Sequence, residues 1–332
     1  MQMKIEKIQF RGADAVRMEA GGYEAVLIPS VGANLVRLYH KEKKIDILHS
    51  PAEGELDAFL KRPHVYGLPL LFPPNRIADG KYTYGEHTYE FPITIPAQHN
   101  YHHGILKNEP FTVTKTFVGA DYVEVETSYF SNMVNDAIYR NFPHQFECRM
   151  TFHLSEAGLE QTVTFVNDSD SDMPLGVGFH TPINVPFMEG DDEYKMFLSV
   201  GEEWELNERS LPTEKLLPLD EQLRLLRTTG MNPTDYPVER ALTNRSLPLG
   251  GESFNGAIFQ NQRTGDAVFY EVDEQYKHWT IWNNGGTAGY MCPEPQTWAI
   301  NAPNLSLDPE VTGFQVVEPG DAWSATTKLY VK

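Results

Sequence analysis

The stretch FECRMTFHLSEAGLEQTVTFV, residues 146–166, decides the fold, because it contains two alternating apolar runs separated by a short break. In residues 146–154 and again in residues 159–166, about every second side chain is apolar, which is typical of a strand with one buried face. The break at residues 156–158 ends in a glycine, as tight turns often do. The stretch therefore predicts two antiparallel strands joined by a turn.

Similar runs recur along the chain. Residues 111–117 and 122–129 predict a second strand pair, and single strands are predicted at 23–28, 267–272, 278–282 and 322–331. Helical patterns are sparse: residues 52–61 predict one short helix, and residues 203–209 and 220–227 are weaker candidates. Because strands recur at spacings of roughly ten residues without alternating helices, the sequence predicts an all-β fold, an antiparallel sandwich or barrel.

The chain has 332 residues, a formal net charge of −19 and 41% hydrophobic residues. Such a charge repels nucleic acids and anionic membranes, so we expect neither as a partner. The Pro-, Thr- and Arg-rich residues 212–253 are interpreted as an excursion within one domain, 1–332, rather than as a linker. Two cysteines, no secretory signal pattern and no apolar run of membrane-spanning length favour a cytoplasmic protein.

Four patches combine polar side chains with turn-forming residues, as sites on β scaffolds often do. They are FPPNRIADG (72–80), HNYHHG (99–104), GVGFHTPINVPF (176–187) and GYMCPEPQTW (289–298). Histidine titrates nearest neutral pH, so the second patch suits proton transfer. Two other interpretations stay open for it: a solvated loop, or a metal site made by His99, His102 and His103.

The other patches each carry one notable side chain. The guanidinium of Arg76 would bind substrate oxygens, or else pair with a carboxylate. His180 follows an apolar run and is either functional or a core residue. Two prolines stiffen the chain around Glu294, which is either a directed carboxylate or part of an exposed turn. Together, one carboxylate and two imidazoles would move a proton between two oxygens.

Other chemistries lack their motifs. The sequence has no phosphate-binding glycine loop between a strand and a helix, no Gly-x-Ser-x-Gly nucleophile elbow and no second ligand constellation with metal-site spacing. The His-x-x-His-His spacing of the second patch could bind a metal, but no second constellation supports it.

The four patches resemble, in order, the motifs of the aldose 1-epimerases, also called galactose mutarotases. The matching residues are NRI at 75–77, N-x-x-H-G at 100–104, G-x-G-x-H at 176–180 and C-x-E-P-x-T at 292–297. The resemblance implies one large antiparallel β-sandwich with a sugar site in an open cleft. It also implies the interconversion of the α and β anomers of a free aldohexose, without metal or cofactor, in a monomer or homodimer.

Carried over by motif, the resemblance assigns roles to single residues. Glu294 would be the general base at the C1 hydroxyl, His180 the general acid at the ring oxygen, and His103 a hydrogen-bonding partner of the sugar. Asn100 would support the His103 loop. The remaining predicted sugar-binding residues are Asn75, Arg76, His102 and Glu239, and the candidate apolar faces for a sugar ring are Tyr101, Phe179, Trp279 and Trp282.

The sequence departs from the family at two places. Thr181-Pro182-Ile183 follows His180 where many members read Pro-Tyr-Phe, and Glu239 is only the nearest candidate for an acidic sugar-binding residue. The preferred sugar therefore stays open. Two alternatives remain: a hexose 6-phosphate epimerase, which needs cationic groups beyond Arg76, and a non-catalytic sugar-binding or sensing protein.

Overall fold

The computed structural model describes residues 3–133, 137–190 and 192–332, and β-strands form most of its regular structure. Every strand pairing in this described part is antiparallel. The predicted all-β antiparallel fold is therefore confirmed.

The hairpin predicted from residues 146–166 is present. Strands β13 (Phe146–Ser155) and β14 (Gly158–Asn167) pair over their whole length, from Phe146 opposite Asn167 to Ser155 opposite Gly158. Side chains of β13 alternate strictly between buried and half-buried. This alternation gives the hairpin one face in the core and one face nearer solvent, as its period of two predicts.

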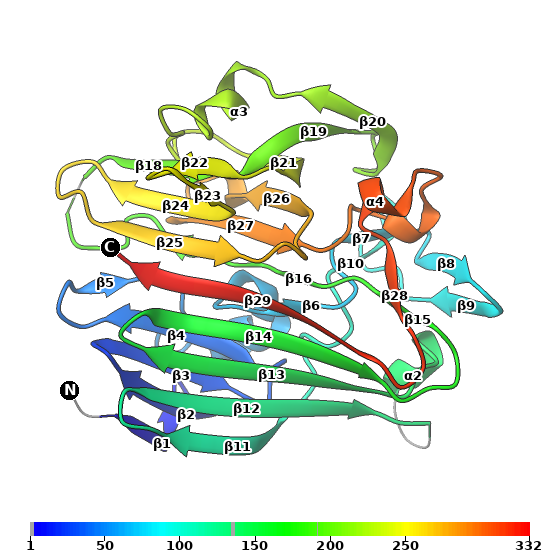
Figure 1. Ribbon diagram of the computed structural model, residues 1–332, viewed down its shortest axis with the longest axis horizontal. Helices are drawn as coiled ribbons and strands as arrows, with labels where there is room; N and C mark the ends of the chain where they lie inside the picture. The colour runs from blue at the N-terminus through cyan, green and yellow to red at the C-terminus, as the bar shows by residue number, and fades with distance from the viewer. Residues whose placement is uncertain (1–2, 134–136, 191) are drawn as a thin grey trace.

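The hairpin lies within an eight-stranded sheet of order β11-β12-β13-β14-β29-β25-β24-β18 (Figure 1). The other members are β11 (Thr112–Val118), β12 (Tyr122–Ser131), β29 (Ala322–Val331), β25 (Ala267–Val272), β24 (Gly256–Asn261) and β18 (Tyr194–Leu198). The C-terminal strand β29, red in Figure 1, pairs with β14 on one side and β25 on the other. The last residues of the chain thus join the two halves of this sheet.

A second large sheet follows the path β20-β19-β21-β26-β27-β16-β6, and β17 pairs with β27 beside this path. Its strands are β20 (Pro212–Pro218), β19 (Val200–Leu206), β21 (Glu239–Asn244), β26 (His278–Trp282), β27 (Tyr290–Gln296), β16 (Gly178–Phe179), β6 (Leu70–Leu71) and β17 (Ile183–Asn184). Residues 212–253 contribute β20 and β21, so this segment is folded into the sheet.

The remaining strands form smaller units. A five-stranded sheet contains β1 (Lys4–Phe10), β2 (Ala13–Ala20), β3 (Tyr23–Ile28), β4 (Asn34–His40) and β5 (Ile45–Asp46). Four ribbons pair β7 (Arg76–Ala78) with β10 (Asn100–His102), β8 (Lys81–Tyr84) with β9 (His87–Glu90), β15 (Met173–Leu175) with β28 (Gln315–Val317), and β22 (Leu247–Leu249) with β23 (Glu252–Phe254).

Helices are few and short. They are α1 (Leu56–Lys61), α2 (Ala137–Asn141), α3 (Glu221–Leu225), α4 (Pro309–Thr312) and the 3₁₀ turns η1 (Pro63–Val65), η2 (Asn284–Gly286) and η3 (Ala302–Asn304). The predictions at residues 52–61 and 220–227 are confirmed by α1 and α3. The prediction at 203–209 is wrong, because β19 occupies this segment, buries Trp204 and pairs with β20 and β21.

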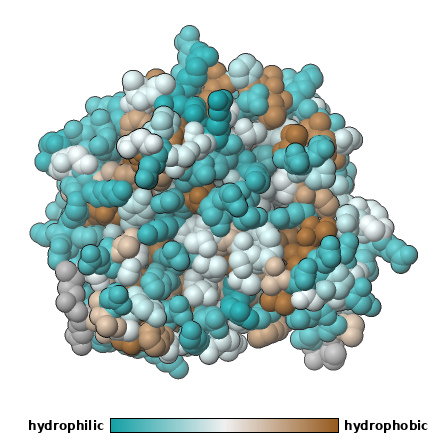
Figure 2. Space-filling view, in the orientation of Figure 1, coloured by the Kyte–Doolittle hydropathy of each residue, from teal (hydrophilic) through white to brown (hydrophobic). Residues whose placement is uncertain are grey.

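The sheets share one continuous apolar core. It includes Tyr23 of β3, Phe152 of β13 and Trp279 of β26, each at most 2% exposed. The face shown in Figure 2 is mostly hydrophilic, with apolar side chains only in scattered spots. No helix in the described part of the chain combines the length and apolar character needed to cross a membrane.

Gly176 marks a close approach of two segments in this core. A Cβ placed on Gly176 would lie 2.1 Å from Cε2 of Trp298, a side chain with 0% exposure. Real non-bonded carbons do not approach so closely, and a buried indole has little room to move. Glycine is therefore required where the chain leading to β16 crosses Trp298.

We predict that Gly176→Ala lowers the free energy of unfolding by at least about 1–3 kcal/mol, because the added methyl group overpacks the core. Denaturant unfolding would measure the loss. Gly119→Ala is the matched control: its Cβ would meet the rings of Phe117 and Tyr122 at 3.1 Å and 3.2 Å, and Phe117 is 43% exposed and can move. Equal unfolding midpoints for the two variants would contradict the prediction.

Candidate active site

A cavity of about 200 Å³ lies where the second large sheet meets the β7–β10 ribbon. Its wall consists of Arg62, His64, Asn75, Arg76, His102, His103, His180, Glu239, Thr280, Trp282 and Glu294. Except for Asn100, all the residues predicted for proton transfer or for hydrogen bonding to a sugar are in this wall. Motifs that are up to about 220 residues apart in sequence thus meet around one space.

Glu294 lies in the middle of β27, so the expected stiff loop is in fact a buried strand. The flanking Pro293 and Pro295 are tolerated there. Strand β26 pairs with one edge of β27. On the other edge, β17 pairs only with Tyr290 and Met291, and β16 pairs only with Gln296. No described strand pairs with the two prolines on this edge, so their missing N–H groups cost no ladder hydrogen bond.

His180 follows β16 directly, and its Nε2 lies 3.3 Å from Oε1 of Glu294. The two side chains are only 3% and 2% exposed. Gly178 makes this contact possible, because it pairs with Gln296 and a Cβ at this position would lie 2.9 Å from the carbonyl oxygen of Pro295. The glycines of the third patch are thus explained by close packing of β16 on β27.

Burial dominates the protonation of this pair. It raises the pKa of Glu294 well above its usual value, although the nearby Arg76 opposes the shift. It lowers the pKa of His180 well below its usual value, and the neighbouring His64 adds to the effect. Because burial disfavours both charged forms, the carboxyl and imidazole together hold one proton near neutral pH.

The first and second patches are neighbours in space. In the β7–β10 ribbon, His102 lies opposite Arg76. Directly after β10, His103 adopts a left-handed conformation (φ 60°), and its N–H donates to the carbonyl oxygen of Asn75 at 3.1 Å. Asn75 is left-handed as well (φ 56°). Two sparsely populated backbone conformations thus direct His103 into the cavity, a feature common at functional sites.

Both open interpretations of Arg76 hold in the structure. The guanidinium lines the cavity, and its Nη2 donates to Oε1 of Glu239 at 2.8 Å. Its Nη1 donates to Oδ1 of Asn75 at 3.2 Å, and Nδ2 of Asn75 donates to Oγ1 of Thr280 at 3.0 Å. This chain of contacts fixes several hydrogen-bonding groups around the space, as recognition of a polyhydroxylated ligand requires.

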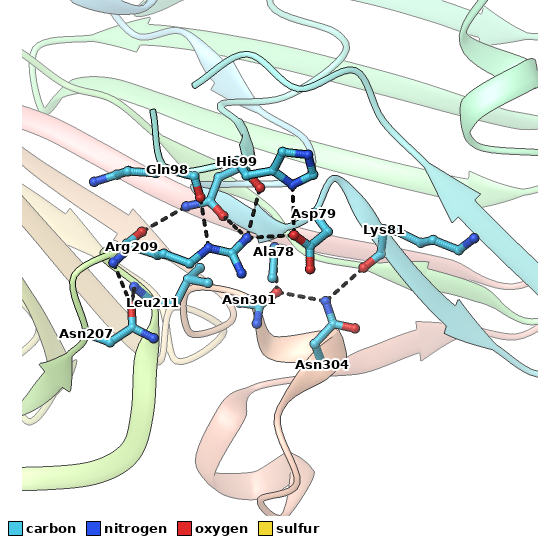
Figure 3. A network of polar contacts seen from close by, with 11 residues as sticks. Ala78, Asp79, Lys81, Gln98, His99, Asn207, Arg209, Leu211, Asn301 and Asn304 are labelled. Atoms are coloured by element: carbon cyan, nitrogen blue, oxygen red, sulfur yellow. Dashed lines mark hydrogen bonds and ion pairs between the residues drawn. The ribbon is translucent and has the colours of Figure 1, made fainter. Parts of the chain in front are cut away.

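Asn100 is not in the cavity wall and contacts Arg209, which Figure 3 shows beside Gln98 and His99. Its Nδ2 donates to the carbonyl oxygen of Arg209, in the turn between β19 and β20, at 2.8 Å. Arg209 in turn donates to the carbonyl oxygens of Gln98 and His99 at 2.8 and 2.9 Å, and to the Asp79 carboxylate at 2.8 Å. Arg209 and Asn100 therefore hold the segment that leads to His103.

Among the four aromatic candidates, only Trp282 lines the cavity. Tyr101, Phe179 and Trp279 are buried in the large core, so their interpretation as a sugar-binding face is wrong. The period of two explains the difference between neighbours in β26: Trp279 points to the opposite face of the strand from Thr280.

Three wall residues were missed by the sequence analysis: Arg62, His64 and Thr280. Arg62 and His64 flank Pro63 at the end of the short helix α1. Polar residues beside a proline were the signal used for the other patches, so this pair could have been found. Thr280 lies within an apolar strand and gives no such signal.

The cavity also brings together three potential metal ligands. Donor atoms of His103, His180 and Glu294 lie within 4.8 Å of one another, whereas His99 is exposed and binds Asp79 instead. Ligating histidines normally donate their second ring nitrogen to an acceptor. The Nδ1 atoms of His103 and His180 are sealed from solvent and have no partner among the described residues. The set fits proton transfer better than metal binding.

Comparisons with known proteins agree with the fold and the motifs. A family model described as aldose 1-epimerase matches residues 14–330. A crystal structure of a galactose mutarotase-like protein from Clostridium acetobutylicum is 37% identical, with a TM-score of 0.97 over 99% of this chain and 98% of that one. Galactose 1-epimerase from Lactobacillus acidophilus, 13% identical with 100% and 99% of the two chains covered and a TM-score of 0.73, shares the fold.

Among curated sequences, the chain is similar to YihR of Escherichia coli K12, described as an uncharacterized protein. The two are 26% identical over 212 residues. This match covers 64% of the chain and 63% of the length of the relative.

We predict that Arg209→Ala loosens the segment before His103. Losing its hydrogen bonds should speed amide hydrogen exchange at residues 98–104 about tenfold, the equivalent of about 1.4 kcal/mol of local stability. Exchange measured by mass spectrometry would resolve this segment. Arg263→Ala, which removes an exposed double contact with Asp192 elsewhere, is the control and should leave these residues unchanged. Identical exchange in both variants would show that the Arg209 contacts do not restrain the segment.

Proposed function

Because the chain belongs to the aldose 1-epimerase family, we propose that it interconverts the α and β anomers of a free aldohexose. The observation that carries the proposal is the 3.3 Å contact between His180 and Glu294 in a cavity that also exposes His103 and Arg76. Such a site holds an acid and a base within reach of one sugar ring.

In the proposed reaction, the Glu294 carboxylate takes the proton from the C1 hydroxyl while imidazolium of His180 donates one to the ring oxygen. The bond between C1 and the ring oxygen breaks with its electron pair on that oxygen, and C1 becomes an aldehyde. Rotation about the C1–C2 bond followed by closure on the other face gives the other anomer. Before the sugar binds, burial keeps the shared proton on Glu294, so the reaction requires the bound sugar to shift this proton to His180. Ring opening then returns a proton to Glu294, and the two groups exchange roles on closure.

The surrounding residues have binding roles in this proposal. His103 donates to the C1 or ring oxygen, and Arg76, Asn75 and Glu239 bind hydroxyl groups. His102 contributes to the wall, and Asn100 supports the His103 segment through Arg209. The reaction changes no oxidation state, so these side chains suffice without a cofactor.

Polarimetry on freshly dissolved α-glucose and α-galactose tests the proposal directly. We expect equilibration far faster than in buffer alone. Sugar binding without faster anomer exchange, in a panel of common aldoses, would instead support a non-catalytic binding protein.

We predict that Glu294→Gln lowers kcat by about 10²–10⁴-fold, because an amide cannot accept the C1 proton. The same variant should be more stable than the wild type at neutral pH. Burial raises the pKa of Glu294 in the folded state, so unfolded wild type loses its proton first as pH rises above about 4.5, and the folded state loses relative stability.

The difference in unfolding free energy between the two proteins should therefore be absent below pH 4.5 and should grow as the pH rises above it. Its final size should be about 1.4 kcal/mol for each unit by which folding raises the pKa of Glu294. Thermal unfolding from pH 4 to 8 would measure it, and His180 is common to both proteins. The opposite result would be a variant that is less stable than the wild type, by an amount that grows with pH. It would mean that attraction between charged Glu294 and charged His180 outweighs the cost of burying the carboxylate.

A hexose 6-phosphate is the second candidate substrate, and Arg62 is the observation that favours it. Its guanidinium lines the cavity and makes no ion pair with any residue of the described part. Arg62 is thus a second cation in the cavity wall, besides Arg76, whose guanidinium already forms an ion pair with Glu239.

We predict that glucose 6-phosphate does not compete with free hexose below about 1 mM, since a single exposed arginine is a weak phosphate site. Inhibition of the polarimetric rate would measure competition. Tight inhibition that Arg62→Ala weakens would reverse the assignment and make the phosphorylated sugar the substrate.

A further inference from the structure

His64 forms a triangle with the two histidines assigned to the reaction. Its ring centroid lies 5.3 Å from that of His103 and 5.6 Å from that of His180, and the latter two are 5.3 Å apart. All three rings belong to the wall of the cavity. His64 therefore stands as close to the reacting region as the residues that motif comparison selects.

The backbone around His64 is fixed by a buried asparagine. Asn34, which has 0% exposure, donates from Nδ2 to the carbonyl oxygens of Pro63 at 3.2 Å and Tyr66 at 2.9 Å. Its Oδ1 accepts from the N–H of Leu68 at 2.9 Å. The turn η1 is thus held from both sides, and the imidazole is presented by a rigid element, as precise ligand binding requires.

The ring is neutral across the physiological range. Burial, together with the nearby cations Lys107 and Arg62, lowers the pKa of His64 to about 3. Within the described residues, Nδ1 is sealed and has no hydrogen-bond partner. Nε2 is not sealed and makes no hydrogen bond in this part of the structure, so it is the nitrogen that a ligand can reach.

One buried histidine outside the cavity, His144, is bonded differently from His64. His144, which has 0% exposure, places Nε2 2.8 Å from the hydroxyl of Tyr89 and Nδ1 3.2 Å from that of Ser169. Both ring nitrogens are satisfied, as is usual for buried polar groups. His64 lacks such partners although it is held rigidly.

We propose that His64 is a further substrate-contacting residue, which recognises one hydroxyl group of the sugar through Nε2 and so determines specificity. The inference rests on the proposed function and names a residue outside the four motifs. A neutral imidazole donates or accepts at Nε2 according to its tautomer, and a hydroxyl group can do both. A hydrogen bond can therefore form between them with either group as the donor. A sugar without that hydroxyl would leave Nε2 unpaired.

A series of deoxy sugars tests the proposal. For the parent hexose, His64→Phe should lower kcat/KM by about 10- to 100-fold, because it removes the nitrogen and keeps a ring of similar size. For the one deoxy sugar that lacks the recognised hydroxyl, the wild type and His64→Phe should be equal within about twofold. His64→Gln, whose amide reaches the position of Nε2, should recover part of the activity. His144→Asn, as the control, should affect every sugar equally.

The outcomes separate this inference from the proposed function. An equal loss for every deoxy sugar would overturn the role of His64 while the mutarotase activity stands. If the wild type accelerates no anomer exchange, nitrogen NMR of histidine-labelled wild type with glucose decides: a shift of the His64 Nε2 signal supports the contact. Shifts of His103 and His180 alone, or no shifts at all, overturn it, and this measurement does not depend on a variant that folds.

Discussion

The contact between Glu294 and His180 is the constraint on which the site depends. Two groups that ionise readily in water lie 3.3 Å apart with almost no exposure. Charging either one alone in such surroundings costs several kcal/mol, so the pair keeps a single proton and little net charge. A sugar that brings hydroxyl groups into the cavity supplies the polarity that the protein withholds. These surroundings suit the proposed proton transfer better than the binding of an ion.

The fold provides this contact through three local features of the second large sheet. Gly178 lets β16 approach β27 closely, and Pro293 and Pro295 occupy a stretch of β27 that needs no donors on that edge. The β7–β10 ribbon then adds His103 and Arg76 from the opposite side of the cavity. None of these features gives proton transfer alone, and each follows from packing or hydrogen bonding that the local sequence determines.

Sequence patterns predicted strands such as β3, β13 and β29 because burial on one face imposes a period of two, but they missed many other strands of the described part, including β1, β2 and β4. The pattern failed at residues 203–209, where charged residues around Trp204 favour a helix locally but sheet pairing satisfies the backbone. It also took the proline-flanked Glu294 for a loop residue. The motifs predicted most of the cavity wall. Thr280 was missed because it lies in an ordinary apolar strand, whereas His64, beside Pro63, has the same signal as the other patches and was overlooked.

Several sealed polar atoms without a hydrogen-bond partner lie in the cavity wall, and others lie elsewhere in the described part of the chain, such as the hydroxyl of Tyr82 and Nε2 of His278. Nδ1 of His64, His103 and His180 and Oε2 of Glu294 are sealed and unpartnered among the described residues. Each such atom costs about 1–3 kcal/mol. The large apolar core, which spans the sheets, offsets this cost. His144 shows that a buried histidine outside the cavity can have both ring nitrogens hydrogen-bonded. Because the unpartnered atoms of the wall are sealed, a ligand in the cavity must bind through the other polar atoms of the wall, such as Nε2 of His64.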